Sequence, residues 1–528
     1  MEDEHCSSSP FAADFSSQKR EGIKSSAVHN VAVLRRREIA IAIGKERRDA
    51  LMLTKRLCRD VTVNNDEGSV ESDMIVDEGK TDLNNQTLRA VENLKSSMSY
   101  LGKGSLQKKL EALKSLRRLL SKTNVPSIEV AIQAGAVPLL VDCLSFGASD
   151  EQLLETAWCL TNIAAGRTEQ TESLMPALPM LIAHLGEKSS NRVTEQCAWA
   201  LGNVAGEGQH PRNILLSQGV LLPLARLMQS DKASTARTSA WALSNLIKGP
   251  ESKAATELIK INGVSEAILR HLKKQDEELA TEVSWVVVYM SALSQLATSM
   301  LARNGIIPLL VEKLQGSEST QMLIPVLRSL GNFVAADNYT INSVLVVGQN
   351  MTNNVISALV KCLQSGHRIL KKEAGWVMSN ITAGSIEHKK LAYSSEATVV
   401  LLHLLSIATF EIKKEAAYAL GNLCVAPRED QSQPDVITDH LVSIVERGCL
   451  KGFISLMKSP DIEAARIGLQ FLELVLRGMP NGAGPKLVEK EDGIDAMERF
   501  QFHENEEIRN MANGLVDRYF GEDYGLDD

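Results

Sequence analysis

The sequence predicts an all-α protein built from stacked helical repeats, and two observations lead to this fold class. The first is a short phrase in which asparagine follows tryptophan by four residues. It has four strict copies along the 528-residue chain: Ala157–Asn162, Ala198–Asn203, Ala240–Asn245 and Gly375–Asn380. The second is the composition, with 44% hydrophobic but only 4% aromatic residues. That balance is typical of helices rich in Leu, Ala and Val, and it argues against a β sandwich.

The spacing of the phrase gives the size of the repeat. Degraded copies are Trp285…Tyr289, Arg328…Asn332 and Tyr418…Asn422. Successive copies are 41, 42, 44, 43, 48 and 42 residues apart. This period is that of a helical solenoid of the armadillo or HEAT type. Because each repeat buries its apolar face on the next, such a chain grows without a central core.

Glycine and proline mark the expected helix ends. Several repeats contain Gly-x-x-Pro-Leu-Leu, as at Gly135–Leu140 and Gly305–Leu310, and Gln218–Leu224 has one extra residue. We expect this glycine to end one short helix in the left-handed conformation and the proline to lie in the first turn of the next. A further glycine is expected to end the third helix of several repeats: Gly166, Gly206, Gly249 and Gly384. Three helices per repeat favour an armadillo solenoid.

The domain organisation follows from charge and periodicity. Residues 86–518 are expected to form a superhelical solenoid of about ten repeats, followed by an acidic tail at 519–528. Residues 1–60 form a flexible basic arm, and 61–85 an acidic flexible linker. Residues 19–59 hold 12 Lys and Arg against 4 Asp and Glu, a net charge of +8, which leaves −16 for the rest of a chain whose total is −8. An acidic solenoid indicates basic partners.

The repeated tryptophan and asparagine predict a peptide-binding groove. Residues i and i+4 of a helix share a face, so stacked repeats align these side chains into two parallel rows. An amide both donates and accepts hydrogen bonds, as the backbone of an extended peptide requires. The stem of a lysine or arginine fits between two indoles, with about 0.5–2 kcal/mol from each cation–π contact. A buried tryptophan is more often core than ligand, but four copies in register with asparagine favour binding.

Acidic residues near the repeat aromatic are expected to receive the cationic head groups. Those three or four positions before it are Glu155, Glu195, Glu282, Glu373 and Glu415. Glu207 follows Asn203 by four positions. Together they would give the groove an acidic edge. The predicted ligand is an extended, basic, intrinsically disordered peptide.

Nothing in the sequence predicts an enzyme, a cofactor or a metal site. The ten His lack metal-binding spacing, and no phosphate-binding loop or nucleophile elbow is present. The eight Cys form no C-x-x-C pair and are expected to be reduced thiols of an intracellular protein. Val283–Ala302 has 20 residues without a charge. It begins at a copy of the phrase, so we expect buried repeat helices there and no membrane span.

In these features the chain resembles a divergent member of the importin-α (karyopherin-α) family, over nearly its whole length. The resemblance implies a nuclear import adaptor, not an enzyme, that binds basic nuclear-localisation signals and links cargo to importin-β. It implies shuttling between cytoplasm and nucleus through the nuclear pore. It also implies release when Ran-GTP binds importin-β, and an export receptor at the C-terminal repeats. Direct contact with nucleic acid or membrane is not expected.

The resemblance also implies two signal-peptide sites. The major site would comprise Trp158, Asn162, Gly166, Thr171, Glu195, Trp199, Asn203, Glu207, Trp241, Asn245 and Glu282. Within it, Gly166 and Thr171 match the family's residues that hold a key lysine, and Glu207 replaces an aspartate. The minor site would comprise Arg328, Asn332, Glu373, Trp376, Asn380, Glu415, Tyr418 and Asn422, with Tyr418 in place of the usual tryptophan.

The arm resembles the family's importin-β-binding segment at Leu34–Glu38 and Lys45–Asp49. Its implied contact residues are Arg35, Arg36, Arg37, Lys45, Arg47, Arg48, Lys55 and Arg56. In the family a Lys-Arg-Arg-like cluster of this segment occupies the groove when importin-β is absent. Only Lys55–Arg59, Lys-Arg-Leu-Cys-Arg, matches it here. We therefore predict weak autoinhibition.

Two other functions are open to an armadillo solenoid. One is a scaffold of the β-catenin type with a different peptide ligand. Such scaffolds grip acidic partners through a Lys/Arg-lined groove, and the acidic solenoid argues against this alternative. The other is a ubiquitin-ligase subunit, but no U-box-like or RING segment stands outside the repeats.

Overall fold

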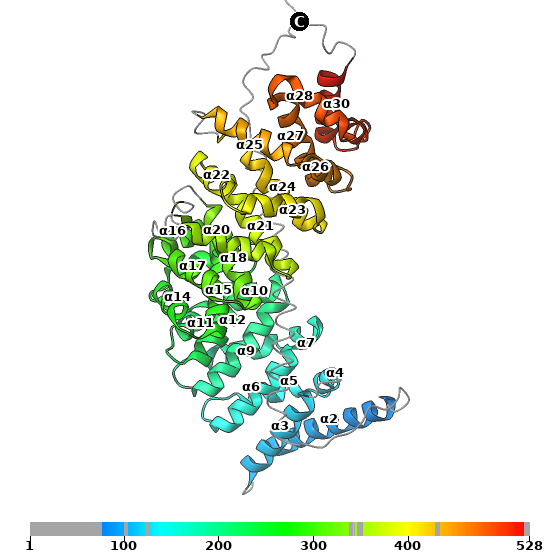
Figure 1. Ribbon diagram of the computed structural model, residues 1–528. Coiled ribbons are helices and arrows are strands. Elements are labelled where there is room, and N and C mark those ends of the chain that lie inside the picture. Colours follow the sequence, from blue (N-terminus) through cyan, green and yellow to red (C-terminus); the bar gives the residue numbers. More distant parts are fainter. Residues whose placement is uncertain are drawn as a thin grey trace, which may run out of the picture. The chain divides into compact units, whose positions relative to one another are not determined.

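The computed structural model describes residues 76–99, 104–121, 126–336, 342, 344–345, 352–427 and 433–521. They belong to two compact units that divide between Ala336 and Asp337, called here the N-terminal unit and the C-terminal unit. Within the described residues every regular element is a helix (Figure 1), which confirms the all-α class. The basic arm, residues 1–60, lies outside the described residues.

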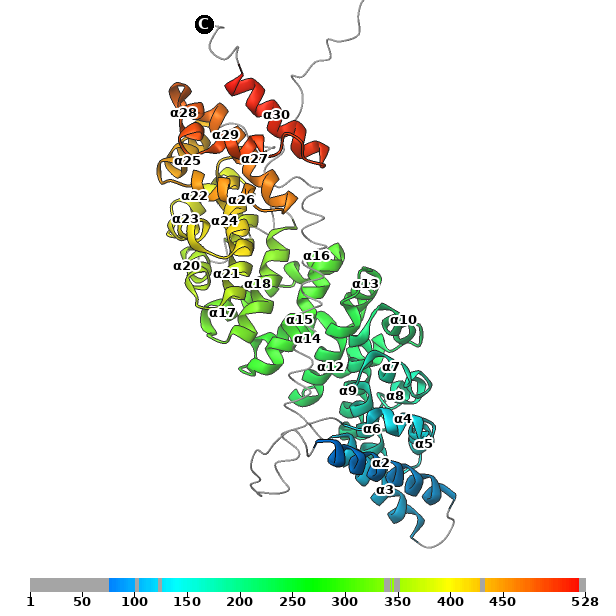
Figure 2. The ribbon, with the colours of Figure 1, turned by 90° about the vertical axis from the view of Figure 1, so that its right-hand side faces the viewer.

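The N-terminal unit begins with α2 (Val76–Ser99) and α3 (Ser105–Leu120). Five repeats follow, each with two shorter elements or groups and one long helix. They are α4 (Ile128–Gln133), α5 (Ala136–Cys143) and α6 (Asp150–Ala164); α7 (Thr168–Glu172), η2 (Met175–Ala177), α8 (Leu178–Ala183) and α9 (Asn191–Glu207); α10 (Gln209–Ser217), α11 (Leu221–Met228) and α12 (Ala233–Ile247); α13 (Lys253–Lys260), α14 (Val264–Lys273) and α15 (Glu277–Leu293); α16 (Gln295–Arg303), α17 (Ile306–Gly316) and α18 (Thr320–Val334). The long helices α3, α6, α9, α12, α15 and α18 pack on one another in chain order (Figure 2).

The C-terminal unit repeats this arrangement. Its elements are α20 (Thr352–Gln364) and α21 (Arg368–Thr382); α22 (Ile386–Tyr393), α23 (Ala397–Ile407) and α24 (Phe410–Leu423); α25 (Pro434–Glu446), α26 (Leu450–Met457) and α27 (Ile462–Gly478); η3 (Pro480–Gly482), α28 (Ala483–Lys490), α29 (Gly493–Glu498) and α30 (Glu506–Phe520). The long helices α21, α24, α27 and α30 again pack in order. Across the described parts of the two units ten long helices serve as third helices, in agreement with about ten repeats.

Local sequence accounts for many helix ends. Side chains at the N-caps of several long helices accept hydrogen bonds from backbone amides of the first turn, as Ser149 does from Gln152 and Asp276 does from Leu279. Gly135 and Gly305 have φ of 82° and 86°, so they adopt the predicted left-handed conformation. The prolines that follow lie in the first turns of α5 and α17. The predicted glycine–proline boundary is confirmed at these positions.

Two boundaries differ from those expected. Helix α2 begins at Val76, so residues 76–85 belong to a helix and not to the linker. Thr81, Asp82 and Asn85 are exposed helix positions, and Gln86 donates to Asp82 one turn earlier at 2.7 Å. The second difference is Gly206, which lies inside α9. The chain leaves α9 only after Glu207, at Gly208, so Gly206 does not end the helix.

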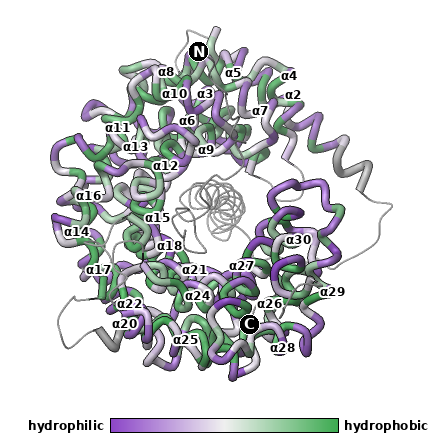
Figure 3. The backbone as a smooth tube through the Cα atoms, turned by 90° about the horizontal axis from the view of Figure 1, so that it is seen from above, coloured by the Kyte–Doolittle hydropathy of each residue, from purple (hydrophilic) through white to green (hydrophobic). Residues whose placement is uncertain are grey.

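Hydrophobic and hydrophilic residues alternate along the helices of each unit, as expected where one face of a helix is buried (Figure 3). The uncharged stretch Val283–Ala302 is divided between α15 and α16 by Ser294, whose backbone is extended. None of the described helices combines the length and apolarity that a membrane span needs. Six cysteines fall in the described residues, and all six are buried and unbridged: Cys143, Cys159, Cys197, Cys362, Cys424 and Cys449.

Candidate peptide-binding site

The tryptophans of the N-terminal unit stand on consecutive long helices. Trp158, Trp199, Trp241 and Trp285 belong to α6, α9, α12 and α15. The ring centroids of Trp199 and Trp241 are 5.1 Å apart with the rings tilted by 31°. At this distance the two rings are in contact. The expected slot for a lysine stem between this pair is therefore wrong, and the pair forms one continuous aromatic surface.

A glycine on α9 allows this contact. A Cβ added to Gly202 would lie 2.3 Å from Cζ3 and 2.8 Å from Cε3 of the Trp241 ring. Only a residue without a side chain lets the indole pack directly on the backbone of the preceding repeat. Trp199 and Trp241 are 7% and 5% exposed, so most of each ring is packed against the protein.

The asparagines form the predicted row, and they also join the repeats. Nδ2 of Asn203 donates to the carbonyl oxygen of Thr161 at 3.3 Å, and Nδ2 of Asn245 donates to that of Gly202 at 3.2 Å. In both cases the acceptor directly precedes the equivalent asparagine of the previous repeat. Asn332 and Asn422 make the same bond, to Val288 at 3.1 Å and Ser379 at 2.9 Å. The sequence analysis missed this second role.

The first repeat places an arginine in the row. Asn162 donates to Oγ of Ser121 at 2.8 Å, so Ser121 holds the asparagine position of that repeat and Arg117 its tryptophan position. The Arg117 guanidinium lies 4.4 Å from the Trp158 ring centroid and its Nε lies 2.5 Å from Oε2 of Glu155. Glu155 is therefore paired within the protein, which corrects its expected place on the acidic edge.

Glu195 is also engaged by its own protein. Lys232 pairs with its Oε1 at 2.7 Å, and the hydroxyls of Ser234 and Thr235 donate to the same oxygen at 2.9 and 2.5 Å. Burial alone would raise the pKa of Glu195, but these hydrogen bonds outweigh burial and hold the pKa below its usual value. The carboxylate stays ionised, with much of its charge balanced by Lys232.

The residues expected to hold a key lysine gather around α7. Thr171 is fully buried and donates to the carbonyl oxygen of Ala164 at 3.1 Å. Thr168, three residues before Thr171 on α7, donates to Oε2 of Glu207 at 3.0 Å. Thr171 and Glu207 are therefore both located at this short helix. A local contact also favours glycine at position 166, because a Cβ there would lie 2.3 Å from Oε1 of Gln170. That oxygen accepts a hydrogen bond from the backbone amide of Arg167.

The expected minor site is divided between the units. Arg328 and Asn332 lie on α18 of the N-terminal unit, where the Arg328 guanidinium stands 5.6 Å from the Trp285 ring centroid. The other expected residues lie on α21 and α24 of the C-terminal unit: Glu373, Trp376, Asn380, Glu415, Tyr418 and Asn422. All six are buried. Glu282 of the expected major site is likewise buried, on α15.

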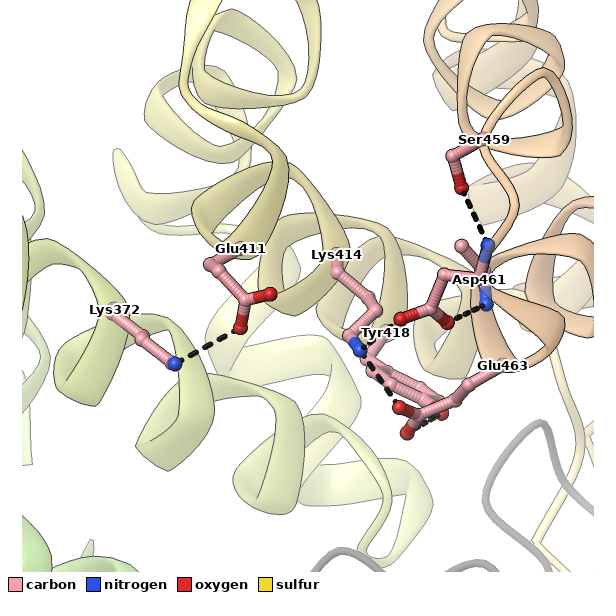
Figure 4. Close-up of polar contacts among 8 residues, drawn as sticks. Lys372, Glu411, Lys414, Tyr418, Ser459, Asp461 and Glu463 are labelled. Carbon is pink, nitrogen blue, oxygen red and sulfur yellow. Dashed lines mark hydrogen bonds and ion pairs between the residues drawn. The ribbon is translucent and has the colours of Figure 1, made fainter. Parts of the chain in front are cut away.

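Tyr418 belongs to a charged cluster that links α24 to α27 (Figure 4). Its hydroxyl donates to Oε1 of Glu463 at 2.6 Å. Nζ of Lys414 lies 2.8 Å from Oε2 of Glu463 and 3.3 Å from Asp461. Burial would raise the pKa of Glu463, but the hydrogen bonds from Lys414 and Tyr418 hold it below its usual value. The tyrosine hydroxyl, which tryptophan lacks, therefore forms a hydrogen bond between two repeats.

Two buried lysines beside the asparagine rows escaped the sequence analysis. Lys248 is 2% exposed and donates to Oδ1 of Asn245 at 3.0 Å. Lys389, also 2% exposed, donates to the carbonyl oxygens of Thr382 at 2.5 Å and Asn422 at 2.6 Å. Only an alignment of the repeats, which places these lysines three and nine residues after an asparagine, could have revealed them.

The parts of the chain that the structure describes contain no group of three His, Cys, Asp or Glu able to hold a metal ion. The expected importin-β contacts, Arg35 to Arg56, fall outside those parts. The candidate site therefore rests on the aromatic and amide rows and the carboxylates beside them.

Comparison with known proteins agrees with the repeats. Residues 124–165 and 208–248 match the armadillo/beta-catenin-like repeat, and residues 486–528 match the atypical Arm repeat. The crystal structure of an engineered protein is similar to 80% of this chain and 97% of its own, with a TM-score of 0.68 and 23% identity. That likeness concerns the fold alone, and it agrees with an armadillo solenoid.

Relatives along the whole chain identify the family. The chain is 63% identical to importin subunit alpha-9 of Arabidopsis thaliana, over 97% of this chain and 99% of the relative. It is 61% identical to importin subunit alpha-2 of Oryza sativa subsp. japonica, over 100% of both. The chain therefore belongs to the importin subunit alpha family, whose members are adaptors of nuclear import and not enzymes.

Proposed function

We propose that the N-terminal unit binds a basic nuclear-localisation signal as an extended peptide along α6, α9, α12 and α15. The observation that carries this proposal is the Trp199–Trp241 surface, with Asn203 and Asn245 one turn further along the same helices. Each amide gives one N–H to a carbonyl oxygen of the previous repeat, and we propose that the peptide backbone bonds to the same amides, since a side-chain amide both donates and accepts. Backbone recognition of this kind accepts many sequences, as an adaptor requires.

Side-chain selection would come from charge and aromatic surface. Lysine and arginine stems would lie across the indole surface, since the Trp199–Trp241 contact leaves no slot between those rings. Glu207, beside Thr168 and Thr171, is the carboxylate that we assign to a key lysine. Glu195, already paired with Lys232, would add less.

A second basic cluster would bind the C-terminal unit at Trp376, Asn380, Tyr418 and Asn422, with Glu373 and Glu415 on the same helices. The rest of the adaptor cycle is proposed from the family. Residues 1–60 would bind importin-β through the basic positions between Arg35 and Arg56. The C-terminal repeats would bind an export receptor, and the protein would shuttle between cytoplasm and nucleus.

A pair of peptides tests this function against a scaffold that grips acidic partners. One is an extended peptide rich in Lys and Arg, and the other has the same length with Asp and Glu at those positions. Titration calorimetry with the whole chain should give micromolar or tighter binding for the basic peptide, about −8 kcal/mol or better, weakening as salt rises. Binding of the acidic peptide instead would contradict the proposal and favour the scaffold.

A further inference from the structure

One position recurs in the repeats nine residues after the row asparagine, or after Tyr289 where tyrosine replaces it. In the N-terminal unit this position holds Thr171, Arg212, Ala254 and Thr298. Among the described residues of the C-terminal unit it holds Lys389. It lies in the short helix that follows each long helix, and each of these side chains is 9% exposed or less.

The polar members of this set make the same hydrogen bond. Each donates to the carbonyl oxygen seven residues earlier, at the C-terminal end of its long helix. The bonds are Thr171 to Ala164 at 3.1 Å, Arg212 to Ala205 at 3.2 Å, Thr298 to Ser291 at 3.1 Å and Lys389 to Thr382 at 2.5 Å. The end of a helix with free carbonyls attracts positive charge. Two of the repeats therefore fill this position with a cation of their own, and two with a neutral hydroxyl.

Arg212 and Lys389 are deeply buried cations. Arg212 is 5% exposed, and its second guanidinium nitrogen donates to Oε1 of Gln209 at 3.1 Å. Lys389 also donates to the carbonyl oxygen of Asn422 in the next repeat, at 2.6 Å. In the repeat with Ala254 the buried cation is Lys248, which donates to Oδ1 of Asn245.

A carboxylate accompanies Thr171 but not the two buried cations of this set. In the repeat with Thr171, the next long helix ends with Glu207, four residues after Asn203, and Thr168 of α7 donates to it. In the repeat with Lys389, the residue four positions after Asn422 is Ala426. The corresponding residue is Gly249 in the repeat with Arg212 and Ala336 in the repeat with Thr298. Among these repeats, therefore, the one with Thr171 combines a neutral hydroxyl with a carboxylate, and those with Arg212 and Lys389 have a cation and no carboxylate at that position.

We propose that Arg212 and Lys389 are specificity-determining residues that fix the register of the bound peptide. This inference rests on the proposed function. A ladder of near-identical Trp/Asn repeats binds a basic peptide equally well after a shift by one repeat. The internal cation stands where the repeat of Thr171 would receive the key lysine. Its positive charge repels a peptide lysine, whereas the neutral hydroxyl of Thr171 does not, so in the N-terminal unit the lysine is held beside Thr171 and not one repeat further on.

An alanine scan of the lysines in a labelled basic peptide tests this, with affinities measured by fluorescence anisotropy on the whole chain. For the wild type we expect one scan position to dominate, with a loss of about 10- to 100-fold, because one charge-assisted set of hydrogen bonds is lost. In Arg212→Thr a second position opens one repeat further on. The peptide can then shift, and the dominant loss should fall below about fivefold. Arg212→Lys, which retains a cation, should restore the dominant position.

Each scan compares the affinities of different peptides for the same protein variant. A general loss of stability would lower all of these affinities together and would not change which lysine dominates. An unchanged dominant loss in Arg212→Thr would overturn the inference, as would a wild-type scan without any dominant position. If Arg212→Thr does not fold, as judged by circular dichroism, Lys389→Thr with a peptide for the C-terminal unit is scanned in the same way. Failure of the wild type to bind the parent peptide would instead overturn the proposed function, before any variant is used.

Discussion

The hydroxyl of Tyr418 donates a 2.6 Å hydrogen bond to the carboxylate of Glu463, one repeat further along the C-terminal unit. Nζ of Lys414 lies 2.8 Å from Oε2 of the same carboxylate and forms an ion pair with it. Tyrosine at this row position therefore ties α24 to α27 through a charged acceptor. The substitution exchanges part of the aromatic surface for a link between two repeats.

We predict that Tyr418→Phe destabilises the protein by about 1.5–3 kcal/mol, the range for a hydrogen bond to a charged group. Denaturant unfolding followed by circular dichroism measures this. In a double-mutant cycle, Glu463→Gln should cost markedly less in the Tyr418→Phe background than in the wild type. Equal costs in the two backgrounds would show that the two side chains do not act together.

Two carboxylates that look alike in the sequence should differ in their effect on peptide binding. Glu155 is paired with Arg117 at 2.5 Å, whereas Glu207 lies at α7, where Thr168 donates to it and where we place the key lysine. We expect Glu207→Gln to weaken binding of a basic peptide about tenfold and Glu155→Gln to weaken it less than about twofold. Anisotropy titrations at one salt concentration compare them. A larger loss for Glu155→Gln would contradict the assignment of Glu207.

The buried Lys389 predicts a dependence of stability on pH. Burial lowers its pKa from 10.5 to about 8. The folded state then holds this proton less tightly than the unfolded state. The cost of burying the charge is present in full below pH 8, and it is relieved as the pH rises from about 8 towards 10.5.

The comparison variant is Lys389→Met, which keeps the length of the side chain without its charge. From pH 7 to pH 9.5 the unfolding free energy of the wild type should rise by about 2 kcal/mol relative to the variant. The difference between the two proteins cancels the titration of other groups. A difference that does not change with pH would mean that Lys389 keeps its ordinary proton affinity.

Deletion of the basic arm gives a prediction drawn from the sequence alone. The cluster Lys55–Arg59 is a weak match to the family's groove-binding segment. We therefore expect removal of residues 1–60 to raise the affinity for a signal peptide less than about tenfold, or about 1.4 kcal/mol. The truncation should not extend beyond residue 75, because α2 begins at Val76. A gain of tenfold or more would show strong autoinhibition.

The fold was predictable because its signals are local or strictly periodic. The Trp/Asn phrase placed the long helices, and glycine followed by proline marked the boundaries next to α5 and α17. The prediction failed at α2, where the acidic and polar composition of residues 76–85 resembled that of a linker although the segment is helical. The prediction that Gly206 ends a helix was wrong because glycine can lie within a helix as well as end one.

The site was predictable as a set of rows but not as a set of contacts. The pairing of Arg117 with Glu155 joins residues 38 positions apart and depends on how two repeats stack. The contact between Trp199 and Trp241 depends on Gly202, whose importance appears only when the neighbouring indole is in place. Arg212 and Lys389 look like ordinary surface charges in the sequence, and their burial follows from the repeat geometry.

The central claim is that the asparagine rows bind a basic peptide, and the most direct measurement is anisotropy of a labelled bipartite basic peptide with Asn203→Ala/Asn245→Ala. Both asparagines also join repeats, so the matched control is Gln196→Ala. It removes another bond between α9 and α6, from Gln196 to the hydroxyl of Thr161 at 2.8 Å, and leaves both asparagines in place.

All three proteins are first shown to be folded by thermal melting. We predict micromolar or tighter binding to the wild type and to Gln196→Ala, corresponding to about −8 kcal/mol or better. The double variant should lose at least about tenfold in affinity, as expected for two lost hydrogen bonds to the peptide backbone. Equal affinity for a folded double variant and the wild type would contradict the account.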